Sequence, residues 1–220
     1  MAIKNLIKLD FYAMKPLVRI MIIFLIIPII LGIVADLGAS ILVTLTFSAF
    51  MLNVIFSITE KSNFYKLYGI LPVRMTQCII SRYLFSSIVV VFAGILSFAN
   101  YIILSLALNG IIDWKRGGEF LALSMLIAFL FISIQYPFYF RFEYSKAMIM
   151  SILPYVLCFA IGVPLTQYLM KNDSFRIIIM GIIKYFSDNI LVMLVSGITI
   201  SMLVMTISCI ISIKIRKKEI

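Results

Sequence analysis

Ionisable side chains are scarce in this chain of 220 residues, which contains no histidine and only 13% charged residues. Histidine is the commonest metal ligand in proteins and a frequent general base near neutral pH. The three cysteines, Cys78, Cys158 and Cys209, have no paired spacing, so we expect small buried side chains rather than a disulfide or a metal site. No catalytic residue, cofactor or metal ligand is predicted in the chain itself.

The long apolar runs carry almost no Asp, Glu, Lys or Arg between their ends. A charged side chain near the bilayer centre costs roughly 2.5–3.5 kcal/mol on insertion scales, so such residues usually mark ion or proton pathways. Their absence argues against an ion-coupled transporter, and the lack of paired aspartates, a Ser/His pair or a metal-binding cluster argues against an intramembrane protease. Four amides remain as candidates for a substrate path or, more commonly, for hydrogen bonds between helices: Asn53, Asn100, Gln135 and Gln167.

Hydrophobic residues make up 64% of the chain, whereas they are about half of an ordinary soluble protein. About 20 apolar residues cross the hydrocarbon of a bilayer as a helix. The pattern predicts an all-α integral membrane protein with a single domain over residues 1–220. The six predicted transmembrane helices are residues 17–35, 39–58, 83–108, 119–140, 148–170 and 189–213. Apolar residues 177–183 are too few to span and predict a short external helix folded back on the bundle.

The formal net charge of +10 is divided unevenly between the two sides that these spans define. With the N-terminus inside, the cytoplasmic segments hold 14 Lys and Arg residues against four acids, and the external segments hold five of each. Basic residues in short loops favour the cytoplasmic face, so both termini are predicted to be cytoplasmic. This distribution accounts for the charge without a nucleic-acid partner. The aromatic run at residues 136–144 predicts an aromatic belt at the cytoplasmic interface.

Residues 1–16 predict an amphipathic helix that lies along the membrane surface before the first span. The residues that share its apolar face, at about 100° per residue, are Ile3, Leu6, Ile7, Phe11 and Met14. Asp10 falls within this face, so it should meet a polar partner or mark a break. Pro16 favours a sharp turn into the first span. A solvated basic tail is the alternative.

Residues 60–74 form the densest patch of charged and aromatic residues between two spans. A short helix from about Ser62 to Gly69 would present aromatic side chains on one face, which fits a hydrophobic groove on a partner protein. The alternative is an ordinary basic loop whose aromatic rings rest on the bilayer. The chain has no Gly-x-x-x-x-Gly-Lys-Ser/Thr sequence, so ATP would have to be held by such a partner. The residues predicted to couple to it are Glu60, Phe64, Tyr65, Leu67, Tyr68, Leu71, Pro72 and Arg74.

This loop resembles a motif of ABC-2 type exporter permeases. That family typically has an acid, a basic residue and an aromatic, then Leu-Pro-Val with a nearby arginine, then Lys/Arg-Tyr-Leu. The matching residues here are Glu60-Lys61, Phe64, Leu71-Pro72-Val73-Arg74 and Arg82-Tyr83-Leu84. Met75-Thr76-Gln77 departs from the Ser/Thr-Arg pair that is common at that place. The likeness covers essentially the whole chain, including residues 142–146 and the basic tail at 214–218.

The resemblance implies the transmembrane subunit of an exporter in the bacterial cell membrane. Such a subunit pairs with a second permease, identical or different, and with two cytoplasmic ATPase subunits that hold ATP and magnesium. In these assemblies the loop between spans two and three carries the coupling helix that docks on the ATPase.

From this resemblance we expect ATP-driven export of an amphipathic or hydrophobic substrate, above all a peptide. In the general character of its sequence the chain is most similar to the membrane subunits of the staphylococcal exporter of phenol-soluble modulins. Its composition suits a low-GC Gram-positive bacterium. Drugs, antibiotics or lipids are alternative substrates. The alternative of another class is a passive membrane scaffold or immunity protein without an ATPase.

Overall fold

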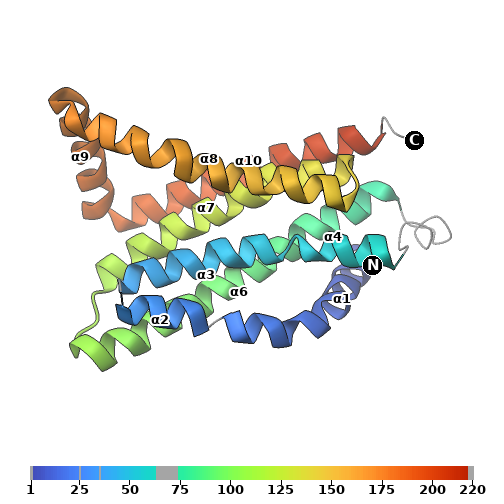
Figure 1. The fold of residues 1–220 in the computed structure, drawn as a ribbon, viewed down its shortest axis with the longest axis horizontal. Coiled ribbons are helices and arrows are strands. Elements are labelled where there is room, and N and C mark those ends of the chain that lie inside the picture. The colour runs from blue at the N-terminus through green and yellow to red at the C-terminus, as the bar shows by residue number, and fades with distance from the viewer. Residues whose placement is uncertain (1, 25, 35, 63–73, 218–220) are drawn as a thin grey trace.

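The chain folds into a bundle of long helices that run roughly along one direction, as the computed structural model shows (Figure 1). The structure describes residues 2–24, 26–34, 36–62 and 74–217. The helices, in chain order, are α1 (Ala2–Phe24), α2 (Ile26–Val34), α3 (Leu37–Met51), α4 (Val54–Lys61), α6 (Met75–Asn109), α7 (Trp114–Arg141), α8 (Tyr144–Lys171), α9 (Asp173–Asp188) and α10 (Ile190–Lys217). No strand occurs among these residues, which confirms the all-α prediction.

The bundle has two distinct ends (Figure 1). At one end of the bundle α1, α6 and α8 begin and α4, α7 and α10 end, and we call this the basic end. The opposite end holds the α2–α3 and α6–α7 connections together with α9. The N-terminal and C-terminal helices therefore reach the same end of the molecule. Which side of a membrane that end faces stays a prediction.

Five helical segments in the described part of the chain are long and apolar enough to cross a membrane. They are Leu37–Lys61, Met75–Leu108, Trp114–Arg141, Tyr144–Leu169 and Leu191–Lys217. These segments correspond to the last five of the six predicted spans, and most extend beyond the predicted ends. The predicted span at 17–35 is divided between the end of α1 and α2, so the count of six stays a prediction.

Helix α6 begins well before its predicted start. It begins at Met75, eight residues before the predicted start at residue 83, because Arg74 adopts an extended N-cap conformation and Gln77 completes a capping box. The Gln77 side-chain oxygen accepts a hydrogen bond from the Arg74 backbone N–H at 3.3 Å. Arg82 therefore lies inside α6, whereas the motif had suggested that it opens the helix.

Helix α1 continues through Pro16 to Phe24 and does not end at the expected turn. An internal proline removes one backbone hydrogen bond and bends a helix without necessarily ending it, and α1 is drawn as a curved helix (Figure 1). Among residues 3–15 of α1, the buried positions are Leu6, Asp10 and Met14, which lie four residues apart. This face packs on α6 and α4, so the buried part of the apolar face predicted for residues 1–16 lies against the bundle.

Helix α7 is central and packs against α3, α6, α8 and α10. Ile41, Leu45 and Ile132 are completely buried in this core. Gly38 allows the Phe120 ring of α7 to pack closely on α3, since a Cβ there would lie 2.4 Å from the ring. Residues 177–183 lie within the longer helix α9, which links the end of α8 to the start of α10, and its external location stays a prediction.

Candidate functional site

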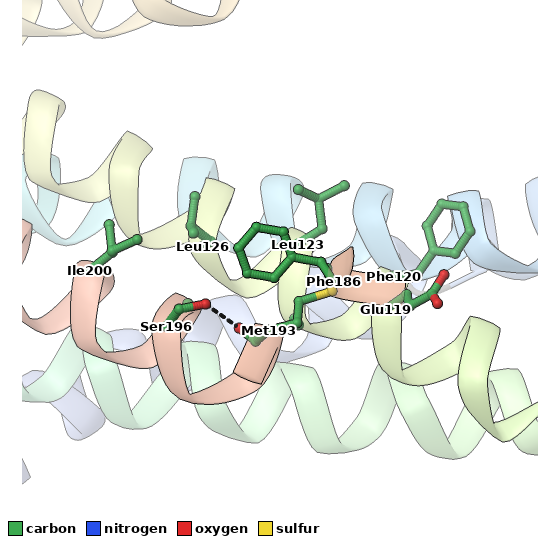
Figure 2. A pocket seen from close by; sticks show the side chains of 10 residues that line it. Glu119, Phe120, Leu123, Leu126, Phe186, Met193, Ser196 and Ile200 are labelled. Atoms are coloured by element: carbon green, nitrogen blue, oxygen red, sulfur yellow. Dashed lines mark hydrogen bonds between the residues drawn. The ribbon is translucent and has the colours of Figure 1, made fainter. Parts of the chain in front are cut away.

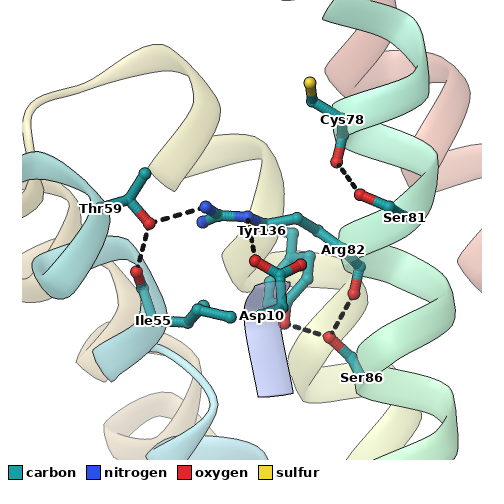
Figure 3. A network of polar contacts seen from close by, with 8 residues as sticks. All are labelled: Asp10, Ile55, Thr59, Cys78, Ser81, Arg82, Ser86 and Tyr136. Carbon is teal, nitrogen blue, oxygen red and sulfur yellow. Dashed lines mark hydrogen bonds and ion pairs between the residues drawn. The ribbon is translucent and has the colours of Figure 1, made fainter. Parts of the chain in front are cut away.

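Arg82 brings three helices together at the basic end of the bundle (Figure 3). It projects from α6, and its Nε lies 3.8 Å from Oδ1 of Asp10 on α1. Its Nη2 donates a hydrogen bond to Oγ1 of Thr59 on α4 at 2.6 Å. The guanidinium carbon also lies 4.8 Å from the centre of the Phe56 ring, within the range of a cation–π contact. One side chain thus joins α1, α4 and α6.

The Arg82–Asp10 pair is almost fully removed from solvent, with side chains 7% and 3% exposed. Burial raises the pKa of the Asp10 carboxyl from 3.8 to about 6, and the nearby Arg82 charge counteracts part of that effect. Arg82 Nη1 has no hydrogen-bond partner among the described residues. A buried pair of this kind is costly to assemble, and removing one member is costlier still because a buried charge is left alone. The sequence anticipated a polar partner for Asp10, and Arg82 is that partner.

Glu60 makes a second contact from the same turn of α4. Its Oε2 accepts a hydrogen bond from the backbone N–H of Tyr144 at 2.7 Å. Tyr144 is the first residue of α8, where unpaired N–H groups and the helix dipole favour a negative charge. Neighbouring residues Thr59 and Glu60 therefore connect the end of α4 to α6 on one side and to α8 on the other.

Aromatic rings surround Phe56 inside the bundle. Its ring centre lies 4.7 Å from that of Tyr139 in a stacked arrangement, and 5.0 and 5.3 Å from those of Tyr136 and Phe140 in edge-on arrangements. These three α7 residues are buried. The prediction that residues 136–144 form an interfacial belt is therefore wrong for them. Helix rotation turns them inward, and Tyr136 also shares a hydrogen bond with Ser86.

The described residues of the predicted coupling loop are its two flanks. Glu60 is exposed apart from its contact with Tyr144, and Arg74 is exposed at the start of α6. Phe64, Tyr65, Leu67, Tyr68, Leu71 and Pro72 lie outside the described residues. The role of all eight stays a prediction.

The structure brings together two of the four amides that the sequence proposed for a substrate path. Asn53 Nδ2 donates to Gln135 Oε1 at 2.8 Å, and both residues are buried. Gln135 Nε2 in turn donates to the Ser151 carbonyl on α8 at 3.4 Å. Asn100 is half-buried on α6 and Gln167 is exposed on α8, so neither joins this group.

The opposite end has a different character. Arg116 Nη2 lies 2.9 Å from Asp36 Oδ1, and Lys115 Nζ lies 3.5 Å from Asp188 Oδ1, with all four side chains at least one-third exposed. Near this opposite end, an apolar cavity of about 510 Å³ lies between α7, α9 and α10. Figure 2 shows Phe186 from α9 among its lining side chains. The cavity has few polar atoms and offers no cluster of groups for chemistry.

Reactive groups are dispersed through the described part of the chain. No group of three or more His, Cys, Asp or Glu side chains there could hold a metal ion. The three cysteines are free, and their expected burial holds for Cys78, is partial for Cys209 and is wrong for Cys158, which is exposed on α8. Several buried polar contacts instead connect helices, among them Arg82–Thr59, Asn53–Gln135 and Tyr83–Ser208.

A multi-pass helical membrane protein, with a buried ion pair at one end of the described bundle, is the class that the fold and this site define. A family model described as ABC-2 family transporter protein matches residues 5–217, and the chain belongs to this family. No curated protein and no solved structure matches the chain. Membership implies a transmembrane transporter component that associates with ABC ATPase subunits and is generally not catalytic itself.

Proposed function

We propose that the chain is the permease subunit of an ATP-binding cassette exporter in a bacterial cell membrane, working with two cytoplasmic ATPase subunits and a second permease. The observation that carries this proposal is the pair of contacts in the last turn of α4. Thr59 connects that turn to Arg82, and Glu60 connects it to the start of α8. This turn leads directly into the loop predicted to dock on the ATPase, so a displacement of the loop would reach several helices at once.

ATP and magnesium belong to the ATPase subunits in this mechanism, and the permease performs no covalent step. Closure of the ATPases would push on the loop at residues 62–73, with Phe64, Tyr65, Leu67, Tyr68, Leu71 and Pro72 as the contact residues. Glu60 and Arg74 bound the loop where it meets α4 and α6. The spans would then shift between two packings, which is the usual way in which a local input moves a bundle.

The docking role is tested by replacing Phe64, Tyr65 and Tyr68 with alanine. An aromatic side chain that is a hot spot at the centre of an interface contributes at least about 2 kcal/mol, so the loss of even one of the three should lower ATPase co-purification by about 30-fold, and export with it. Tyr12→Ala is a matched control, because Tyr12 is a 72% exposed aromatic residue on α1 near the same end. Unchanged association and export in the triple variant would remove the loop from the mechanism.

An amphipathic peptide is the substrate class that we favour, by likeness to the exporters of phenol-soluble modulins. The scarcity of charge in the spans suits a substrate that enters from the lipid, and drugs, antibiotics or lipids would fit the same interior. ATP hydrolysis measured with the reconstituted complex in liposomes separates these classes, since the true substrate stimulates it. Amphipathic helical peptides should stimulate hydrolysis at lower concentration than a lipid or a drug.

The second permease would pack against an apolar surface of this chain. Helix α8 offers one, because Ile149, Leu153 and Val156 are each more than half exposed. The partner is either an identical or a different chain, and the mass of the purified complex distinguishes the two. A chain that purifies without any ATPase would instead support a passive scaffold or immunity protein.

A further inference from the structure

The span at residues 37–61 is a single crossing built from two helices. α3 ends at Met51 and α4 begins at Val54, with Leu52 and Asn53 between them. Around these residues the backbone bonds tighten to three-residue spacing, because the N–H groups of Asn53, Ile55 and Phe56 donate to the carbonyls of Phe50, Leu52 and Asn53. Such a tightened turn within a longer helix is a recurrent form of hinge.

Local sequence does not require this break. Residues 50–56 contain neither proline nor glycine, the usual causes of an interrupted helix. Leu52 and Asn53 also keep right-handed dihedrals, with φ of −59° and −65° and ψ of −23° and −24°. The tightened turn is therefore compatible with a small change into a continuous helix, and tertiary contacts decide between the two forms.

The contact at the break is a buried hydrogen bond between Asn53 and Gln135 of α7. The other side-chain atom of Asn53, Oδ1, is buried and has no partner among the described residues. An unpaired buried acceptor raises the free energy of the arrangement that contains it. This brings the observed packing closer in energy to an alternative in which Oδ1 finds a donor.

The two helices on either side of the break are held differently. α3 is fixed along its length by apolar packing, with Ile41, Leu45 and Ala49 completely buried between α6 and α7. α4 has a shorter buried apolar face, formed by Ile55 and Phe56, and is also held by two polar contacts, those of Thr59 and Glu60. Directional polar contacts can be exchanged for others, whereas the packed surface of α3 resists sliding.

We propose that Leu52 and Asn53 form a hinge on which α4 moves while α3 stays fixed, and that Asn53 is the positioning residue that sets the resting angle through Gln135. This inference rests on the proposed function, because the ATPase subunits would supply the movement. The hinge confines the displacement to the part of the bundle nearest the loop, and the Gln135–Ser151 contact passes it to α8.

Electron–electron distance measurements between spin labels test the hinge in the full complex with its ATPases, in a background with Cys78, Cys158 and Cys209 replaced by alanine. One pair, Lys61→Cys and Lys217→Cys, joins the end of α4 to the end of α10. The other pair, Ala39→Cys and Leu191→Cys, joins the start of α3 to the start of α10. Trapping the ATPases with ATP and vanadate should shift the first distance by more than about 2 Å and leave the second unchanged.

The Asn53→Leu variant tests the positioning role without nucleotide. Its first distance should shift or broaden relative to the parent, and its second should not change. Asn100→Leu, which alters a half-buried amide on α6, is the control and should change neither distance. If Asn53→Leu does not fold, Gln135→Met removes the same hydrogen bond from the other side and should have the same effect.

The inference is overturned if both distances shift together on trapping, if neither shifts while ATP is hydrolysed, or if loss of the Asn53–Gln135 bond leaves the first distance unaltered. A failure of the proposed function looks different, because no ATPase would then associate. In that case the comparison of Asn53→Leu with its parent in the isolated chain still decides whether the hinge exists.

Discussion

The bundle has an ion pair at each end, and the more deeply buried of the two is the one whose charged atoms lie further apart. Arg82 and Asp10 at the basic end are 3.8 Å apart with side chains 7% and 3% exposed. Arg116 and Asp36 at the opposite end are closer, at 2.9 Å, but their side chains are 55% and 34% exposed. Exposed pairs are worth little because water competes for both charges. The Arg82–Asp10 pair should therefore contribute more to stability than the Arg116–Asp36 pair, although its atoms lie further apart. Burial, and not distance, decides which pair is more important.

The largest effect is expected from Arg82→Leu, which leaves the Asp10 carboxylate buried without a partner. Breaking a buried pair in this way costs about 3–5 kcal/mol, to be measured as the free energy of unfolding in detergent. The double variant Arg82→Leu, Asp10→Leu should regain most of that loss, because a well-packed apolar pair often replaces a buried ionic one at little cost. If the free energy of unfolding of Arg82→Leu lies within about 1 kcal/mol of that of the parent, the buried pair does not stabilise the basic end as described.

A pH titration of stability sharpens the comparison from the Asp10 side. The pKa of Asp10 is about 6 in the folded protein and 3.8 as reference, so the folded chain binds this proton more tightly than the unfolded chain. Its contribution to the free energy of unfolding therefore rises as the pH falls from about 6 towards 4, by about 3 kcal/mol at most.

Asp10→Asn removes that contribution, so the difference between parent and variant should change between pH 7 and pH 4. Unfolding in detergent across this range measures it. Parallel pH profiles for the two proteins would show that Asp10 does not titrate as its burial implies.

Packing at the opposite end is tested by Gly38→Ala. The added Cβ would lie 2.4 Å from the Phe120 ring, so α3 and α7 must separate or the ring must move. Overpacking of this kind typically costs about 1–3 kcal/mol. Gly162→Ala is the control, since nothing lies within 4 Å of its added Cβ. Alanine there should stabilise the helix by up to about 1 kcal/mol, and equal effects of the two changes would refute the close contact.

The smallest effect is expected from Lys115→Ala, which removes the exposed pair with Asp188. Such pairs contribute about 0–1 kcal/mol and are screened by salt. Unfolding in low and high salt should show a difference that shrinks as salt is added. A loss comparable with that of Arg82→Leu would erase the distinction between the two ends.

Apolar composition was enough to predict five of the spans, because hydropathy is a local property that every residue carries. The ends were less predictable, since a helix continues past the hydrocarbon wherever a cap allows it. Residues 75–82 are polar enough to resemble a loop, yet Arg74 and Gln77 cap them into α6. The break at Leu52–Asn53 left no signal in the sequence, because it depends on a side chain of α7.

The sequence singled out individual residues of the candidate site, but it did not predict which of them contact each other. Asp10 stood out within an apolar face, and Arg82 stood out within a motif, but nothing local joined residues that meet only when α1 packs on α6. Phe56 looked like an ordinary apolar residue, and the rings of Tyr136 and Tyr139 looked interfacial. Which way an aromatic ring points depends on the rotation of its helix within the bundle, and only the folded chain determines that rotation.

The contact between Glu60 and Tyr144 has a consequence for how the protein is made. The two residues are 84 positions apart, so at about 5–20 residues per second the ribosome needs roughly 4–17 s to deliver the donor after the acceptor. Until then α4 emerges with its carboxylate unpaired, and α6 and α7 enter the bilayer before α8 begins. This contact between α4 and α8 can therefore form only after about two-thirds of the chain has been synthesised.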